Sequence, residues 1–146
     1  QPQETQDVAK RSQILDRFTS MRQVFSLGQQ NIFVELATTS AARTLGLSGR
    51  KNLQKDTGLL MQFDAPYTHG IWMKDMLFPL DIYWFDKDFN LVYKRLSVAT
   101  STYPNVFYPK SDALYVLETI PGLLDTMSLT RTLTGELTYI QSYDKR

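Results

Sequence analysis

Charged side chains, Lys74, Asp75 and Asp81, stand among the apolar residues of the stretch HGIWMKDMLFPLDIYWFDKD, which runs from His69 to Asp88. Lys74 and Asp81 are flanked there by residues suited to a protein core. A charge in such surroundings is costly unless it is paired or lies at an edge. We therefore interpret these charges either as a structural ion pair or as the floor of a site.

Strand periodicity suggests how these charges are presented. In a strand over Leu80–Phe85, Asp81 and Tyr83 point to the same face, opposite Leu80, Ile82 and Trp84. In the preceding apolar segment, Trp72 and Lys74 share a face by the same rule. If the two segments are neighbours, Lys74 and Asp81 are expected to meet on a surface walled by aromatic rings.

Two further residues extend this candidate site. Glu118 ends the apolar run ALYVLE, where a carboxylate forms either a polar wall or a surface charge. Arg50 lies in the expected loop SGRKNLQKDTG, and its guanidinium can bind a carboxylate through two parallel hydrogen bonds. The ligand-binding candidates are therefore Arg50, Trp72, Lys74, Asp81, Tyr83 and Glu118.

An aromatic cleft with opposed charges favours binding without catalysis. Trp72 and Tyr83 would stack on a saccharide or peptide of the cell envelope, while Lys74, Asp81 and Arg50 would orient it.

A hydrolase or lyase is the alternative function. Asp81 or Glu118 would act as the base, and Lys74 or Arg50 would stabilise developing negative charge. The sequence assigns no catalytic residue.

Metal and cofactor sites are not expected. The chain has no cysteine and a single histidine, His69, whereas transition-metal sites usually need several such ligands. The segment DKDFNLVYKRLS begins like a calcium loop but has Leu91 and Ser97 where an EF-hand needs Gly and Glu. We predict a hairpin turn there.

The composition limits the classes of partner. The 146 residues suit one domain, and a net charge of +1 provides no basic field for nucleic acid. The chain contains no run of about 18 apolar residues, so the sequence predicts no membrane span. The polar start without Met is typical of a mature terminus after signal-peptide removal, so we expect a periplasmic, secreted or membrane-anchored protein outside the cytoplasm. Any association with a membrane would take place through an N-terminal segment that is removed or absent. The sequence does not predict the oligomeric state.

The chain divides into three expected regions. Residues 1–12 form a disordered tail, residues 13–28 an amphipathic helix, and residues 29–146 a single globular α+β domain. Ile14, Phe18, Met21 and Phe25 make the apolar stripe of that helix. A third candidate function is assembly or scaffolding, with this helix docked on another protein.

Several short apolar segments predict the fold of the globular region. Strands are expected over NIFVELATT, LLMQF, residues 71–73 and 80–85, LVYKRLSVAT, ALYVLE and ELTYIQSY, with short helices at AARTLGL and GLLDTMSL. DAPYTHG is expected to be a loop. The predicted class is α+β: a strongly bent, mostly antiparallel sheet or partial β-barrel with short helices at its rim.

The ordered segments VELATTSAARTLGLSGRKNLQKDTGLLMQF, IWMKDMLFPLDIYWFDKDFNLV, YVLETIPG and LTGE resemble the domain-of-unknown-function family numbered 192. The resemblance runs from about Asn31 to Tyr143 and implies a small prokaryotic protein, often exported behind a signal peptide or lipoprotein anchor. It implies no established activity. The matching positions are Glu35, Arg50, Trp72, Met73, Lys74, Pro79, Asp81 and Glu118.

Two departures from the family pattern concern the candidate site. Ser48 stands where the family has Met, and Asp75-Met76 stand where it has Asn-Thr. An ionised carboxylate only accepts hydrogen bonds, so a role that needs the Asn donor is not expected here.

Overall fold

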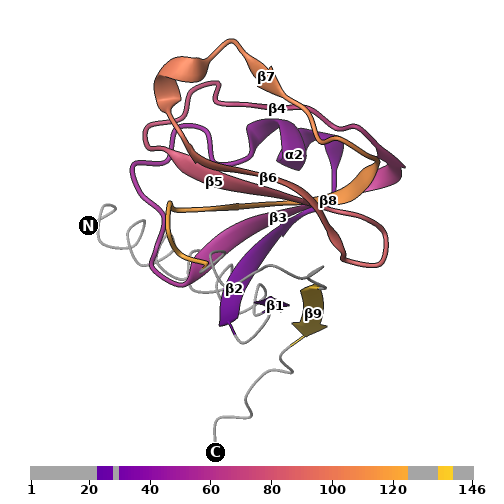
Figure 1. The fold of residues 1–146 in the computed structure, drawn as a ribbon. Helices are drawn as coiled ribbons and strands as arrows, with labels where there is room; N and C mark the ends of the chain where they lie inside the picture. The colour runs from indigo at the N-terminus through magenta and orange to yellow at the C-terminus, as the bar shows by residue number, and fades with distance from the viewer. Residues whose placement is uncertain (1–22, 28–29, 125–134, 140–146) are drawn as a thin grey trace, which may run out of the picture.

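The computed structural model describes residues 23–27, 30–124 and 135–139, which form a curved sheet and a small two-stranded sheet (Figure 1). The main sheet is mixed, with strand order β6-β5-β8-β3-β2-β1-β9. Its strands are β1 (Gln23–Leu27), β2 (Gln30–Ala37), β3 (Thr57–Tyr67), β5 (Leu80–Phe85), β6 (Leu91–Val98), β8 (Ala113–Thr119) and β9 (Gly135–Tyr139). The small sheet pairs β4 (Ile71–Trp72) with β7 (Val106–Phe107), and a 3₁₀ turn, η1, spans Thr100–Thr102.

One parallel pair explains why a helix lies on the sheet. β2 and β3 run parallel, and parallel neighbours need a crossover connection. The crossover contains helix α2 (Ser40–Leu45), which Thr39 caps by accepting a hydrogen bond from the Ala42 amide. Figure 1 shows α2 and the β4–β7 pair on the same side of the main sheet.

Side chains of Leu80–Phe85 alternate between two faces, as predicted, but both faces are buried, including the one predicted to bind a ligand. Leu80, Ile82 and Trp84 belong to the core cluster under α2 and β4. Tyr83 and Phe85 belong to a second cluster with residues of β1 and β2. Because each face has its own core, every residue of β5 is buried.

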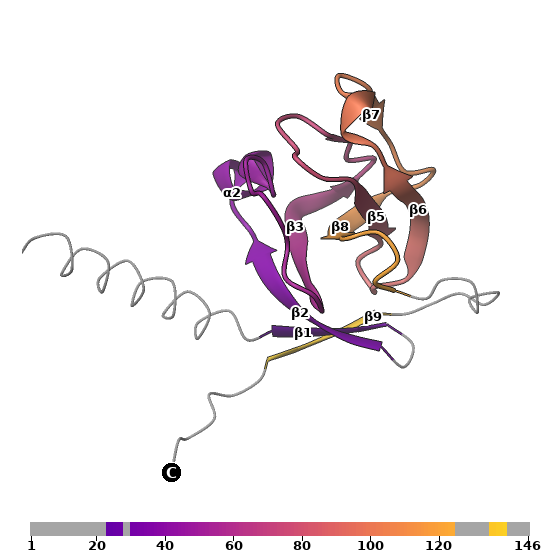
Figure 2. The ribbon, with the colours of Figure 1, turned by 90° about the vertical axis from the view of Figure 1, so that its left-hand side faces the viewer.

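The sheet curls strongly. The rings of Phe25 on β1 and Phe85 on β5 lie 5.1 Å apart, although β8, β3 and β2 separate their strands. In a flat sheet four strand spacings amount to about 19 Å. The second cluster therefore fills the inside of a bend, which Figure 2 shows from the side. Among the described residues, the edge strands β6 and β9 do not pair with each other, so no barrel closes there.

Three predictions about elements need correction. The class is mostly β rather than α+β, because the only α-helix of the described residues has six residues. Gln23–Leu27 form a strand rather than the end of a helix over 13–28, since they pair with β2 in register. β3 continues through Tyr67, where a loop was predicted, and pairs again with β8 beyond an irregularity.

Other predictions fall outside the described residues. These are the tail over 1–12, the helix over 13–22, and most of the helix at GLLDTMSL. No helix in the described part of the chain has the length and apolar character needed to cross a membrane.

Candidate ligand-binding cleft

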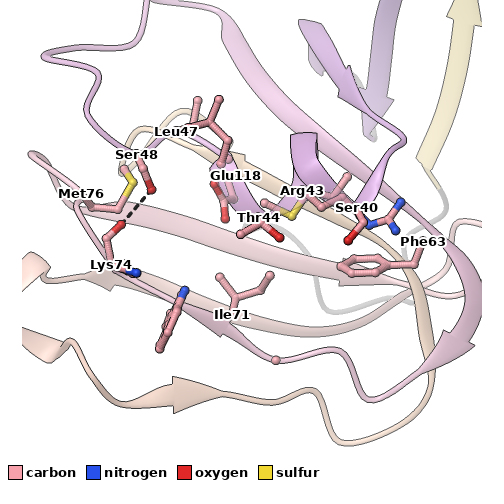
Figure 3. A pocket seen from close by; sticks show the side chains of 15 residues that line it. Ser40, Arg43, Thr44, Leu47, Ser48, Phe63, Ile71, Lys74, Met76 and Glu118 are labelled. Atoms are coloured by element: carbon pink, nitrogen blue, oxygen red, sulfur yellow. Dashed lines mark hydrogen bonds between the residues drawn. The ribbon is translucent and has the colours of Figure 1, made fainter.

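A cleft of about 380 Å³ opens between α2, the loop after it, and the segment from Gly70 to Met76 (Figure 3). Its floor is the face of the main sheet that carries Glu118 and Met61. The volume is at the lower end of the range for small-molecule pockets. The lining residues are Ser40, Arg43, Thr44, Leu45, Gly46, Leu47, Ser48, Met61, Phe63, Gly70, Ile71, Trp72, Lys74, Met76 and Glu118.

Glu118 is a buried acid that faces this cleft. It lies on β8 between Leu59 of β3 and Ile82 of β5, both of them apolar cross-strand neighbours. Its exposed fraction is 3%, and no hydrogen bond or ion pair to its carboxyl group is found among the described residues. Figure 3 shows this carboxyl group among the side chains that line the cleft.

Burial raises the pKa of Glu118 to about 7, from an ordinary value of 4.5. Loss of hydration is the cause, since it disfavours the charged form of a carboxyl group. A perturbed acid that lines a cleft is a candidate functional group.

The rim of the cleft carries an aromatic ring and a cation. Trp72 is 44% exposed. The Lys74 ammonium lies 5.6 Å from the centre of that ring, and the Tyr103 ring lies 5.3 Å from it. Trp72 therefore presents an apolar surface beside the polar groups of the cleft.

Hydrogen bonds fix this rim to the loop after α2. The Ser48 hydroxyl donates to the Lys74 carbonyl at 2.8 Å, and the Gly49 amide donates to the Asp75 carbonyl at 2.9 Å. Asp75 has a left-handed backbone with φ of 57°, which Asn and Asp adopt more readily than most residues. Ser48 and Asp75, which depart from the family pattern, thus take part in hydrogen bonds that hold the backbone of the rim in place.

Arg43 closes the other end of the cleft. It donates to the carbonyls of Thr38 and Gln62, both at 2.8 Å, and its guanidinium lies over the Phe63 ring. A second contact, 3.6 Å long, reaches the exposed Asp64. These contacts leave the Arg43 side chain largely buried.

Asp81 does not pair with Lys74, contrary to the prediction. Asp81 is buried on the opposite face of the sheet from the cleft, where it accepts hydrogen bonds from the amides of Ser97 at 2.7 Å and Gly122 at 2.8 Å. Lys74 is exposed at the rim. In the pairing of β5 with β8, Ile82 lies opposite Glu118 and shares its face of the sheet. Asp81, the preceding residue along β5, therefore points to the other face, away from Lys74 and the cleft.

Tyr83 and Arg50 also lie outside the cleft. Tyr83 is fully buried in the second core cluster, where burial and the nearby Asp81 carboxylate raise its pKa. Arg50 binds both carboxylate oxygens of Glu35, at 2.8 and 2.9 Å, so its fork is occupied by a neighbour in the fold. Of the six candidates, the structure brings together Trp72, Lys74 and Glu118.

Most lining residues were missed by sequence reasoning. Ser40 and Thr44 come from α2, and Leu47, Met61 and Met76 resemble ordinary core residues in sequence. Only the crossover between β2 and β3 places α2 beside β8, and no short-range pattern reports that contact.

Two other sequence motifs have local roles. The ring of His69 stacks on Phe63, and its Nε2 lies 2.8 Å from the Ala65 carbonyl oxygen. The Asp86 carboxylate accepts hydrogen bonds from the amides of Asp88 and Asn90, which builds the predicted hairpin turn. Among the described residues, no group of three or more His, Cys, Asp or Glu side chains could hold a metal ion.

The curled sheet and its ordered motifs define a family of small, mostly β proteins. The family model DUF192, described as "Uncharacterized ACR", matches residues 23–132. The chain therefore belongs to the DUF192 family.

Solved structures show the same fold. One, described as a "putative transcription regulator" from Sinorhizobium meliloti 1021, is similar with a TM-score of 0.68 and 23% identity over 78% of this chain and 90% of that one. Another, a protein of unknown function from Novosphingobium aromaticivorans DSM 12444, has a TM-score of 0.67 and 23% identity over 78% of this chain and 82% of that one. No curated protein matches the chain. The likeness at this identity concerns the fold alone.

Proposed function

We propose that this chain binds a saccharide in the Glu118 cleft, with one sugar ring against Trp72. The observation that carries this proposal is the Glu118 carboxyl group, which is buried, faces the cleft and has no hydrogen-bond partner among the described residues. Because Glu118 lines the cleft, a ligand donor can reach its carboxyl group, and a hydrogen bond there offsets part of the hydration lost through burial.

The surroundings of Glu118 favour a sugar. The exposed ring of Trp72 offers a stacking surface for the apolar face of a pyranose. Hydroxyl groups of Ser40 and Thr44 and the ammonium of Lys74 line the same cleft and can bind ring hydroxyls. The volume of about 380 Å³ suits one sugar unit better than a length of peptide. Because envelope saccharides lie outside the cytoplasm, this ligand agrees with the expected export.

Tryptophan fluorescence tests the proposal, because the chain has two tryptophans and Trp84 is fully buried. Titration with hexoses and amino sugars should change the emission of Trp72. Trp72→Ala should weaken binding about tenfold, measured by calorimetry, as expected for a lost stacking contact. Tyr67→Ala, which removes an exposed ring outside the cleft, should bind like the wild type.

Two results would overturn the proposal. One is the absence of binding by every sugar, with or without binding of short peptides. The other is wild-type affinity in a folded Trp72→Ala variant.

A hydrolase or lyase is the second candidate, favoured by the pKa of Glu118. A carboxyl group with a pKa of about 7 is suited to general acid–base chemistry near neutral pH. Glycoside cleavage by paired carboxylates is disfavoured, because Asp81 lies on the opposite face of the sheet. Product formation during the sugar titrations, lost in Glu118→Gln, would favour this candidate.

A further inference from the structure

This inference rests on the proposed saccharide function and concerns which kind of sugar binds. The side chains that line the cleft limit the chemical groups that the sugar can carry. Glu118 is the only acidic side chain that lines the described cleft. Its cross-strand neighbours, Leu59 and Ile82, are apolar and offer no hydrogen bond from their side chains. A ligand group that reaches this depth therefore meets one carboxyl group in otherwise apolar surroundings.

Several side chains that line the cleft with Glu118 are apolar, so a ligand group at this depth should also present apolar surface. Leu47, Met61, Ile71 and Met76 all line the cleft and belong to the core cluster beneath it. A plain sugar hydroxyl can donate to Glu118, but it brings no apolar surface to these side chains. A methyl group buried against them contributes about 0.8 kcal/mol.

An ammonium group fits this floor poorly. It carries three N–H donors, and each buried donor needs an acceptor. The described lining supplies one carboxyl group and the Thr44 hydroxyl as acceptors near this depth, and an ammonium group brings no apolar surface to the side chains around them. The Lys74 cation at the rim also disfavours a second positive charge in the same cleft.

From this donor and contact count we infer that the sugar is N-acetylated, with its acetamido group at the floor of the cleft. The single acetamido N–H donates to the Glu118 carboxylate. The methyl group contacts Leu47, Met61 and Met76. The acetamido carbonyl accepts a hydrogen bond from the Thr44 hydroxyl, which lines the same cleft (Figure 3).

Calorimetric titration of the full chain with N-acetylglucosamine, glucosamine and glucose tests this inference. At about pH 8, where Glu118 is mostly ionised, N-acetylglucosamine should bind roughly tenfold or more tightly than glucose, as one hydrogen bond and one buried methyl group predict. Glucosamine should bind no more tightly than glucose.

Variants at Glu118 separate its binding role from a structural one. Glu118→Gln keeps an acceptor oxygen and should retain the preference for the acetylated sugar. Glu118→Leu suits the apolar surroundings, should fold, and should show a smaller preference for N-acetylglucosamine over glucose, because the acetamido N–H loses its acceptor while the methyl contacts remain. Asp88→Asn, a matched exchange in the exposed β5–β6 turn, should behave like the wild type.

Each outcome separates this inference from the function on which it rests. Equal binding of the three sugars through Trp72 would overturn the acetamido assignment and leave saccharide binding intact. Tighter binding of glucosamine would overturn it in favour of an ammonium ligand. An undiminished preference in Glu118→Leu would overturn the role of Glu118, and binding of none of the sugars would overturn both proposals.

Discussion

Glu118 and Asp81 show how one chemical group takes two roles in the same sheet. Both carboxyl groups are buried and lie on neighbouring strands. Asp81 accepts two backbone hydrogen bonds, which satisfy its charge within the fold. Glu118 has no such partner among the described residues and faces a cleft. Side-chain type alone therefore does not distinguish the structural acid from the candidate functional one.

The pKa of Glu118 predicts a pH-dependent stability at the residue scale. Between pH 4.5 and about 7 the unfolded chain releases the Glu118 proton while the folded chain keeps it, so stability falls as pH rises. The difference between the two pKa values corresponds to about 3 kcal/mol above pH 7. Glu118→Gln, which does not titrate, should remove this part of the pH dependence.

Urea unfolding of wild type and Glu118→Gln at pH 5 and pH 8 measures this effect. The variant should gain stability relative to wild type at the higher pH. An identical pH dependence in both proteins would mean that Glu118 is hydrated or paired in the folded state.

Asp81 acts at the scale of elements, because its two hydrogen bonds join segments far apart in sequence. Ser97 lies near the end of β6, and Gly122 follows β8, so one carboxylate ties both neighbours of β5 together. Ser97 has a left-handed backbone with φ of 50°, which a strong acceptor helps to hold.

Asp81→Ala should lower the free energy of unfolding by about 3 kcal/mol, because two amides lose a charged acceptor. Denaturant unfolding measures the loss. Below the unfolding transition, sugar binding should be unchanged, since Asp81 lies on the face away from the cleft. Lost binding with unchanged stability would place Asp81 in the site after all.

At the scale of the whole molecule, the cleft exists because a second layer covers one face of the curled sheet. α2 covers one part of that face and the β4–β7 pair another (Figure 1). Gly70 permits the close approach of these small strands. A Cβ atom at Gly70 would lie 2.5 Å from Val106 Cγ1 and 2.7 Å from Tyr108 Cε1.

Gly70→Ala should therefore push β7 away from β4 and shift the Trp72 rim, because Trp72 pairs with Val106. We expect a loss of about 1–2 kcal/mol in stability, typical of overpacking, and weaker sugar binding. Thermal unfolding and calorimetry measure both. Adding Val106→Ala should recover part of each loss; an unaffected Gly70→Ala variant would show that the layer adjusts without cost.

The sequence alone determined the family, the alternation of β5 and most of the strands. These follow from local periodicity, since neighbouring side chains of a strand always point to opposite faces. It also named Trp72, Lys74 and Glu118 as candidates, through residue type and family resemblance. The hairpin at Asp86 followed from turn chemistry within five residues.

Tertiary structure decided which of these residues meet. The register between β5 and β8 sets Ile82 opposite Glu118 and directs Asp81 to the other core. Pairing of β1 with β2 made a strand of residues whose spacing fits a helical stripe. The β2–β3 crossover brought α2 over the sheet and so created the cleft wall. Such contacts depend on which strands become neighbours across long stretches of sequence, and periodicity within one segment does not report that order.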